Sequence, residues 1–493
     1  MRSMGLVIGT ALLLALACGG GSSPPAPQPL SVTLAPAGAS VWTGGTQAFQ
    51  ATVVGSTNQT VAWSVVEASG GSISAAGLYT APSTAGSFHV KAVSAADATK
   101  SAQAPVAVSV QPPAGACNGA ALGPGASLQG FRPFPADNAW NRDVSGDPVD
   151  PNSAAIIAFI GAGTGLHPDF GQGLYNNGPI GIPYLVVASG VQPRVAVTFT
   201  AYGDESDPGP TPIPADAPVE GGSGSTGDRH VLVLDRDACL LYELGRAYPQ
   251  AGGGWQASGA AVWDLKANTL RPYGWTSADA AGLPIFAGLA RYDEVAAGVI
   301  SHALRFTVPT TRRAYVLPAT HWASSNTSAN APPMGLRVRL KAGVDLSAFP
   351  AQARVVLTAL KRYGMILADN GSPWYLSGAP DERWDNTQLR TLAGIKGSDL
   401  EVVQMGPVYT SHPTGPAPLI TSLTATPAAL TPGASAQLSW TSTSATRWFV
   451  TPELGWVTGS SVTVRPTATT TYTLQAEGSY GSATRTVQVV VTP

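Results

Sequence analysis

Short stretches that alternate apolar and polar residues, each followed by a glycine or proline turn, recur through most of the chain. Ser31–Leu34, Ala48–Val53, Val61–Val65 and Phe88–Ala92 are examples. Glycine and proline supply 56 and 42 of the 493 residues, and both interrupt helices and favour turns. Turn signals about every ten residues are typical of β-sandwiches. The sequence therefore predicts a mostly all-β fold.

Proline- and glycine-rich seams divide the chain into five segments. A signal peptide over residues 1–17 and a flexible tether over 18–29 precede a first β-module over 30–112, a central functional domain over 116–405 and a last β-module over 418–493. With roughly 290 residues, the central segment is long enough to bury a substantial core of its own.

The two outer modules resemble bacterial immunoglobulin-like modules of surface proteins. The first carries Trp63 in a strand and the segment Gly77–Pro82, and the last carries Gln437–Trp440 and Pro466–Leu474. The resemblance implies an Ig-like β-sandwich for each. Because both modules lack clustered acids, we expect them to be spacers or weak binding modules.

Strand-like runs also dominate the central segment. They are Tyr184–Val187, Val195–Phe199, His230–Leu234, Leu240–Leu244, His302–Val308 and Gly335–Leu340. One helix is predicted between Pro350 and Gly364, because Val356, Leu360 and Tyr363 fall on one face. We expect an antiparallel jelly-roll or sandwich-like domain with one or two helices.

The first residues resemble an export signal. Arg2 precedes Leu6–Leu16, an uncharged run that is too short for a bilayer span of roughly 20 residues. Ala15-Leu-Ala-Cys18-Gly19 resembles the lipobox of bacterial lipoproteins. The resemblance implies acylation of Cys18 and a location outside the cytoplasm, lipid-anchored at the outer membrane or cell surface. An ordinary secretory signal with a chance cysteine is the alternative.

Composition and charge restrict the classes of partner that the protein can bind. The net charge is −2 and no basic block is present, which argues against nucleic acid as a partner and leaves the lipid anchor as the only membrane contact. Cys117 and Cys239 are the cysteines that remain once Cys18 is lipidated. In an oxidising compartment this pair predicts a disulfide, with two buried free thiols as the alternative.

The acidic segment 203–220 is stiffened by prolines. Its carboxylates are Asp204, Glu205, Asp207, Asp216 and Glu220. Paired carboxylates are what glycosidic hydrolysis needs, one as proton donor and one as base or nucleophile. An oxygen-rich loop is equally suited to Ca²⁺, and a solvated acidic loop is the third interpretation.

Two further charged clusters lie at predicted strands. Asp228 and His230 share a face if the strand alternates regularly, so that Asp228 could orient His230 as a general base; a structural cap with Arg229 is the alternative. In the second cluster, His302 and Arg305 point to opposite faces. At most one of them can therefore line a shared site.

Aromatic residues near acids offer surfaces for sugar rings. Asp369 lies in a turn close to Trp374, Trp384 lies in an acidic patch, and His321 is followed by Trp322. Trp can stack on a sugar, but it is also a common core residue. The alternative interpretation is that Asp369 has only a structural role in the turn.

The central segment also resembles, over most of its length, a type of secreted bacterial domain to which no reaction is assigned. The phrases that carry this resemblance are Phe134–Trp140, Asp204–Pro210 and Gly364–Asn370. The resemblance implies no catalytic residues.

Together these patterns favour a surface-anchored enzyme that degrades a polysaccharide or cell-surface glycan, most simply a glycoside hydrolase. The candidate catalytic residues are Glu205, Asp207, Glu220, Asp228, His230, His302 and Asp369. The candidate substrate-binding residues are Arg229, His321, Trp322, Trp374 and Trp384. A polysaccharide lyase, with His230 or a tyrosine as base and Arg229 neutralising a uronate, is the nearest variant. A non-catalytic glycan-binding lipoprotein is the rival, and no cofactor is expected apart from the Ca²⁺ alternative at 204–220.

Overall fold

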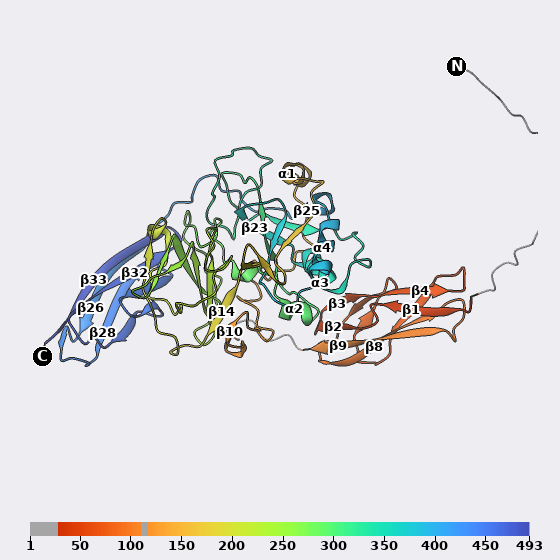
Figure 1. Ribbon diagram of the computed structural model, residues 1–493, viewed down its shortest axis with the longest axis horizontal. Coiled ribbons are helices and arrows are strands. Elements are labelled where there is room, and N and C mark those ends of the chain that lie inside the picture. Colours follow the sequence, from red (N-terminus) through yellow and green to blue (C-terminus); the bar gives the residue numbers. More distant parts are fainter. Residues whose placement is uncertain (1–27, 110–116, 493) are drawn as a thin grey trace, which may run out of the picture.

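The computed structural model describes residues 28–109 and 117–492 (Figure 1). Three β-rich units follow one another in chain order along the longest axis of the molecule (Figure 1). The predicted signal peptide, Cys18 and most of the predicted tether lie outside the described residues. Within the described part of the chain, no helix is long and apolar enough to cross a membrane.

The amino-terminal module is an Ig-like β-sandwich, as predicted. Its strands are β1 (Ser31–Ala35), β2 (Ala39–Trp42), β3 (Thr46–Ala48), β4 (Gln50–Val54), β5 (Val61–Val65), β6 (Ser72–Ile73), β7 (Leu78–Thr80), β8 (Gly86–Ser94) and β9 (Ser101–Ser109). The largest sheet has the order β2-β9-β8-β5. Side chains of β8 alternate between buried and half-buried, so that Phe88 and Val90 enter the core with Tyr79.

The carboxyl-terminal module repeats this architecture. Its strands are β26 (Leu419–Thr426), β27 (Ala429–Leu430), β28 (Ala436–Thr443), β29 (Arg447–Thr451), β30 (Gly455–Val457), β31 (Ser461–Val464), β32 (Thr470–Gly478) and β33 (Gly481–Val491). They form sheets of order β26-β28-β31 and β27-β33-β32-β29-β30. Trp440, Tyr472 and Leu474 fill the core between them.

The central domain is built on two larger sheets. The five-stranded sheet has the order β10 (Gly123–Pro124), β14 (Tyr184–Val187), β16 (Val231–Asp235), β17 (Leu240–Gly245) and β20 (Gly259–Asp264). The six-stranded sheet has the order β11 (His167–Asp169), β24 (Tyr375–Ser377), β21 (Leu304–Val308), β23 (Met365–Asn370), β22 (Arg337–Leu340) and β25 (Leu400–Val402). Antiparallel pairs predominate, but β14–β16, β11–β24 and β21–β23 are parallel, so both sheets are mixed.

Smaller elements complete the central domain. They are the hairpin β12 (Leu174–Tyr175) and β13 (Gly178–Pro179), the sheet of β15 (Val197–Phe199), β19 (Trp255–Ala257) and β18 (Tyr248–Pro249), and the helices α1 (Ser153–Ile160), α2 (Tyr292–Ala296), α3 (Ala351–Arg362) and α4 (Asn386–Arg390). The predicted helix is therefore confirmed as α3, with Val356 and Leu360 buried.

The five-stranded sheet is covered on both faces. Leu232 and Leu234 of β16 enter the core shared with the six-stranded sheet, whereas Val231 and Val233 enter a second core that includes Phe449 of the carboxyl-terminal module. This double burial explains why the sequence of β16 is an unbroken apolar run and not an alternating one.

The predicted disulfide is confirmed. Cys117 and Cys239 are bonded, with Cα atoms 5.4 Å apart, a usual separation for a disulfide. The bond ties the start of the central domain to the start of β17 across 122 residues.

Candidate functional site

Polar side chains gather on one face of the six-stranded sheet. His167 and Asp169 of β11 lie opposite Tyr375 and Ser377 of β24 in the strand register, and directly paired residues share a face. The rings of His167 and Tyr375 are stacked with centroids 4.0 Å apart. His167 and Asp169 are exposed, while Ser377 is buried. This face of the sheet is therefore exposed to solvent at β11 and buried at Ser377 of β24.

Arg305 of β21 lies at the buried end of the same face. Its guanidinium makes a two-point contact with Asp279, with Nε–Oδ2 and Nη2–Oδ1 distances of 2.7 Å, and donates from Nη1 to the hydroxyl of Ser377 at 2.7 Å. Arg305 and Asp279 are both buried. The contact neutralises two charges that would otherwise be costly to bury.

Asp369 is turned onto this face by an irregularity in β23. The register with β21 shifts between Phe306 and Thr307, so that Thr307 pairs with Asp369 where regular alternation would place Ala368. A β-bulge redirects side chains in this way. The Asp369 carboxylate lies 3.7 Å from Nη2 of Arg305. Burial and then the charge of Asp279, outweighing Arg305, raise the pKa of Asp369 to about 7.

Glu220 and His230 form an ion pair beside these groups. Nδ1 of His230 lies 2.6 Å from Oε2 of Glu220, and Nε2 lies 3.1 Å from the carbonyl oxygen of Ala278. Burial opposes the charge on His230, but Glu220 prevails and raises the pKa of His230 to about 9. Burial also opposes ionisation of Glu220, but the charge and hydrogen bonds of His230 lower its pKa.

We name the set Glu220, His230, Asp279, Arg305 and Asp369 the acid–arginine cluster. Its members influence one another electrostatically: Arg305 favours the ionised form of Glu220, and His230 favours that of Asp369. The cluster thus holds a Glu220 whose pKa is lowered together with an Asp369 whose pKa is raised to about 7. A reaction that needs one proton donor and one carboxylate acceptor uses two groups in these different states.

The Gly-rich stretch 221–227 beside Glu220 is held in place by hydrogen bonds. The backbone N–H of Glu220 donates to the carbonyl of His230. Arg229 is buried and donates to the carbonyls of Gly222, Ser223, Ser225 and Ala247. This stretch is therefore a loop that Arg229 fixes to the domain. The guanidinium of Arg229 also lies 4.2 Å from the ring of Tyr248.

The predicted pairing of Asp228 with His230 is wrong. Arg229 adopts a positive φ of 50°, which breaks the alternation on which the prediction depended, and β16 begins only at Val231. Asp228 is exposed, and Glu220 is the carboxylate that binds His230.

The acidic segment 203–220 does not gather its carboxylates. Glu205 accepts the backbone N–H of Thr276, and Asp207 is buried between Arg271 and Arg447. Asp204 and Asp216 are exposed. Across the described residues, no group of three or more His, Cys, Asp or Glu side chains is placed to hold a metal ion. Only Glu220 of this segment reaches the acid–arginine cluster.

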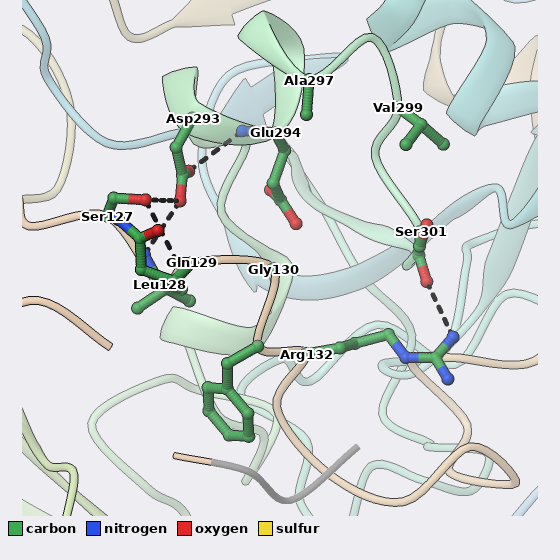
Figure 2. Close-up of a pocket in the computed structure, with 11 residues that line it drawn as sticks. Ser127, Leu128, Gln129, Gly130, Arg132, Asp293, Glu294, Ala297, Val299 and Ser301 are labelled. Atoms are coloured by element: carbon green, nitrogen blue, oxygen red, sulfur yellow. Dashed lines mark hydrogen bonds between the residues drawn. The ribbon is translucent and has the colours of Figure 1, made fainter. Parts of the chain in front are cut away.

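His302 belongs to a different cluster. Its Nε2 lies 3.1 Å from Glu294 and 2.9 Å from Nη2 of Arg291. Glu294 lines a cavity of about 230 Å³. Figure 2 shows Asp293 and Glu294 on one side of this cavity and Arg132 on the other, where Arg132 donates to the carbonyl of Ser301. His302 and Arg305 thus face different surroundings, but strand alternation is not the reason, because His302 precedes β21.

The predicted aromatic platforms Trp374 and Trp384 lie in the core. Both are buried, and their indole N–H groups donate to the carbonyls of Gly161 and Ala379. Trp374 stacks on Phe306, at a centroid distance of 5.8 Å. Neither ring is available to a sugar, so the prediction that they bind substrate is wrong.

Trp322 lies in an aromatic stack elsewhere in the domain, and the neighbouring His321 bonds to the backbone. Trp322 stacks on His412 with ring centroids 4.0 Å apart, and on Tyr315 at 5.6 Å. His321 bonds through Nδ1 to the carbonyl of Ala280. Both rings of the predicted pair are half-buried, and their partners are protein groups.

Sequence reasoning missed Asp169, Asp279 and Ser377. A signal existed for Asp279, which is the single charge in the stretch from Thr276 to Ala290. A lone charge among apolar residues is usually buried and paired, and Arg305 in an apolar strand is its natural complement. No comparable signal marks Asp169, because β11 has only three residues.

No family model and no curated protein match the chain. Among solved structures, it is similar to the N-terminal eight Ig domains of Down syndrome cell adhesion molecule, isoform 1.30.30, with 10% sequence identity and a TM-score of 0.14. The match covers 94% of this chain and 55% of that one, so the chain spans about half of that structure's length. A likeness at this TM-score carries no argument about function.

Proposed function

We propose that the protein is a lipid-anchored, exported glycoside hydrolase that acts on a polysaccharide or cell-surface glycan. Asp369 is the general acid that protonates the leaving oxygen. Glu220 is the carboxylate that acts as base or nucleophile. The observation that carries the proposal is the coexistence of a raised pKa at Asp369 and a lowered pKa at Glu220 within one charged cluster.

The residues around Asp369 and Glu220 fit the roles of proton donor and carboxylate. Arg305 is held by Asp279 and Ser377, and it lies close enough to Asp369 to stabilise the carboxylate left after proton donation. His230 keeps Glu220 ionised. The pKa of the solvent-facing Asp169 is raised, because neighbouring protein atoms displace part of its water and Glu220 adds a like charge against the opposing charge of His167, so Asp169 is a second candidate proton donor.

The lyase variant fits less well. A histidine must be neutral to act as a general base, but the pKa of His230, raised to about 9, keeps its ring protonated at neutral pH, and both ring nitrogens are used in hydrogen bonds. Arg229 is occupied by four backbone carbonyls and has no position from which to neutralise a uronate.

A panel of polysaccharides tests the proposal. The wild type is expected to release reducing ends from at least one of them, and Glu220→Gln and Asp369→Asn should each lower the rate about 10²–10⁴-fold. Asp228→Asn is the matched control, because Asp228 is exposed and outside the cluster. Unsaturated products would instead identify a lyase.

A non-catalytic glycan-binding role is the second candidate, favoured by the hairpin β12–β13. Leu174 and Tyr175 are 69% and 73% exposed. The hairpin lies against the segment that follows Glu220, since a Cβ at Gly178 would be 2.1 Å from the carbonyl oxygen of Gly221. Binding of glycans without cleavage, lost in Tyr175→Ala, would select this role.

A further inference from the structure

A cavity of about 350 Å³ lies beside the six-stranded sheet, next to the edge that carries β22 and β25. Its polar lining residues are Arg142, Asn268, Arg337 and Gln404, and its apolar wall includes Leu270 and Met405. The volume is at the lower end of the range of small-molecule sites, roughly 300–1,000 Å³. The acid–arginine cluster contributes no residue to this lining.

Arg337 brings a positive charge to this cavity, and the nearest opposing charge, Asp147, acts on it without forming an ion pair. Its guanidinium donates to the backbone carbonyls of Ala139 and Arg142, and within the described chain no carboxylate lies within 4 Å of it. Arg339, two residues further along β22, pairs with Glu401 at 2.8 Å. Arg337 is therefore half-buried without an ion-pair partner, whereas Arg339 is buried with one.

The surroundings of Arg337 change its pKa. Burial, and then the positive charge of Arg142, lower the pKa of Arg337 to about 9. Arg142 itself is paired with Asp147 at 2.7 Å, so the net charge at this wall is that of Arg337. An anion in the cavity would offset both effects.

We propose that this cavity binds the carboxylate or sulfate group of a small anionic ligand, held by Arg337 and Arg142, which both line it. A planar guanidinium suits both oxyanions, because its N–H groups match pairs of oxygen atoms. The amide of Gln404, which has no side-chain hydrogen bond among the described residues, supplies a further donor. The site is independent of the proposed hydrolase activity.

Titration calorimetry on the full chain tests the site with sulfate and galacturonate as probes. Galactose and sodium chloride at matched ionic strength are the controls for an uncharged sugar and for general screening. We expect sulfate, galacturonate or both to bind while the controls give no binding heat. Arg337→Met should weaken this binding at least about tenfold, since it removes charged hydrogen bonds.

An isosteric variant keeps the proposal falsifiable if Arg337→Met does not fold. Gln404→Glu places a carboxylate in the cavity and should weaken anion binding several-fold. Gln103→Glu makes the same change on an exposed site of β9 and should leave binding unchanged. A wild type that responds to neither probe beyond the salt control overturns the proposal. So does wild-type affinity in both cavity variants.

Discussion

At the scale of single residues, different surroundings give chemically similar groups different pKa values. Glu220 and Asp369 are both carboxylic acids, but an ion pair with His230 lowers the pKa of one, whereas burial near Asp279 raises that of the other. The sequence predicted Glu220, His230 and Asp369 as site residues. It paired His230 with the wrong acid, because the positive φ of Arg229 has no signature in a residue type that seldom adopts it.

The Glu220–His230 pair predicts a pH-dependent contribution to stability. Because the pKa of His230 rises from about 6.5 unfolded to about 9 folded, its contribution is fully present below pH 6.5 and is lost as the pH rises to 9. The loss amounts to about 3 kcal/mol. Urea unfolding of wild type and His230→Gln at both pH values checks this. A stability difference between the two proteins that does not shrink toward pH 9 would contradict it.

At the scale of elements, strands with a buried face could be predicted from the sequence, but irregularities in the pairing of these strands could not. The run Tyr184–Val187 matches β14 residue for residue, and α3 begins and ends within two residues of its predicted limits. The register shift in β23 that redirects Asp369 could not be predicted. Bulges depend on pairing with a distant strand, which a local sequence pattern does not report.

The disulfide between the first turn of the central domain and β17 should be a main source of that domain's stability. Replacing Cys117 and Cys239 by Ala is expected to lower the free energy of unfolding by up to about 4–5 kcal/mol, because the bridge closes a long loop. Urea midpoints measure this, and reductant should destabilise the wild type but not the variant. An unchanged midpoint in the variant would show that the bridge is not stabilising.

At the scale of the whole molecule, the carboxyl-terminal module is more than the spacer that its sequence indicated. Arg447 of β29 is buried against Asp207 of the central domain and Glu477 of its own module, and Phe449 enters the second central core. Buried charges far apart in sequence carry no pattern that would reveal their pairing. For this reason the docking of the module was not predictable.

Loss of this contact should destabilise both units. Arg447→Met leaves Asp207 with one of its two arginines and Glu477 without its ion pair, and we expect a cost of about 3–5 kcal/mol. Arg485→Met is the control, since Arg485 bonds only to carbonyls within its module. Differential scanning calorimetry should show a lower Tm for the first variant alone. Equal shifts in the two variants would argue against docking through Arg447.

The lipid anchor is a prediction about the part of the chain before the described residues. Cys18→Ser should release the protein from the membrane fraction, because the thiol of Cys18 is the expected site of acylation. Fractionation with a labelled fatty acid checks this. A wild type that is soluble, or a variant that still incorporates the label, would contradict the lipoprotein interpretation.

The most direct test of the proposed chemistry compares two substrates that differ in their leaving group. Proton donation matters for a polysaccharide, whose leaving alkoxide is strongly basic, and much less for an aryl glycoside with an acidic phenol. Asp369→Asn should therefore lose about 10²–10⁴-fold in kcat/KM on the polysaccharide and far less on the aryl glycoside, whereas Glu220→Gln should lose activity on both. Equal losses of Asp369→Asn on the two substrates, or full activity of both variants, would contradict the assignment of acid and base.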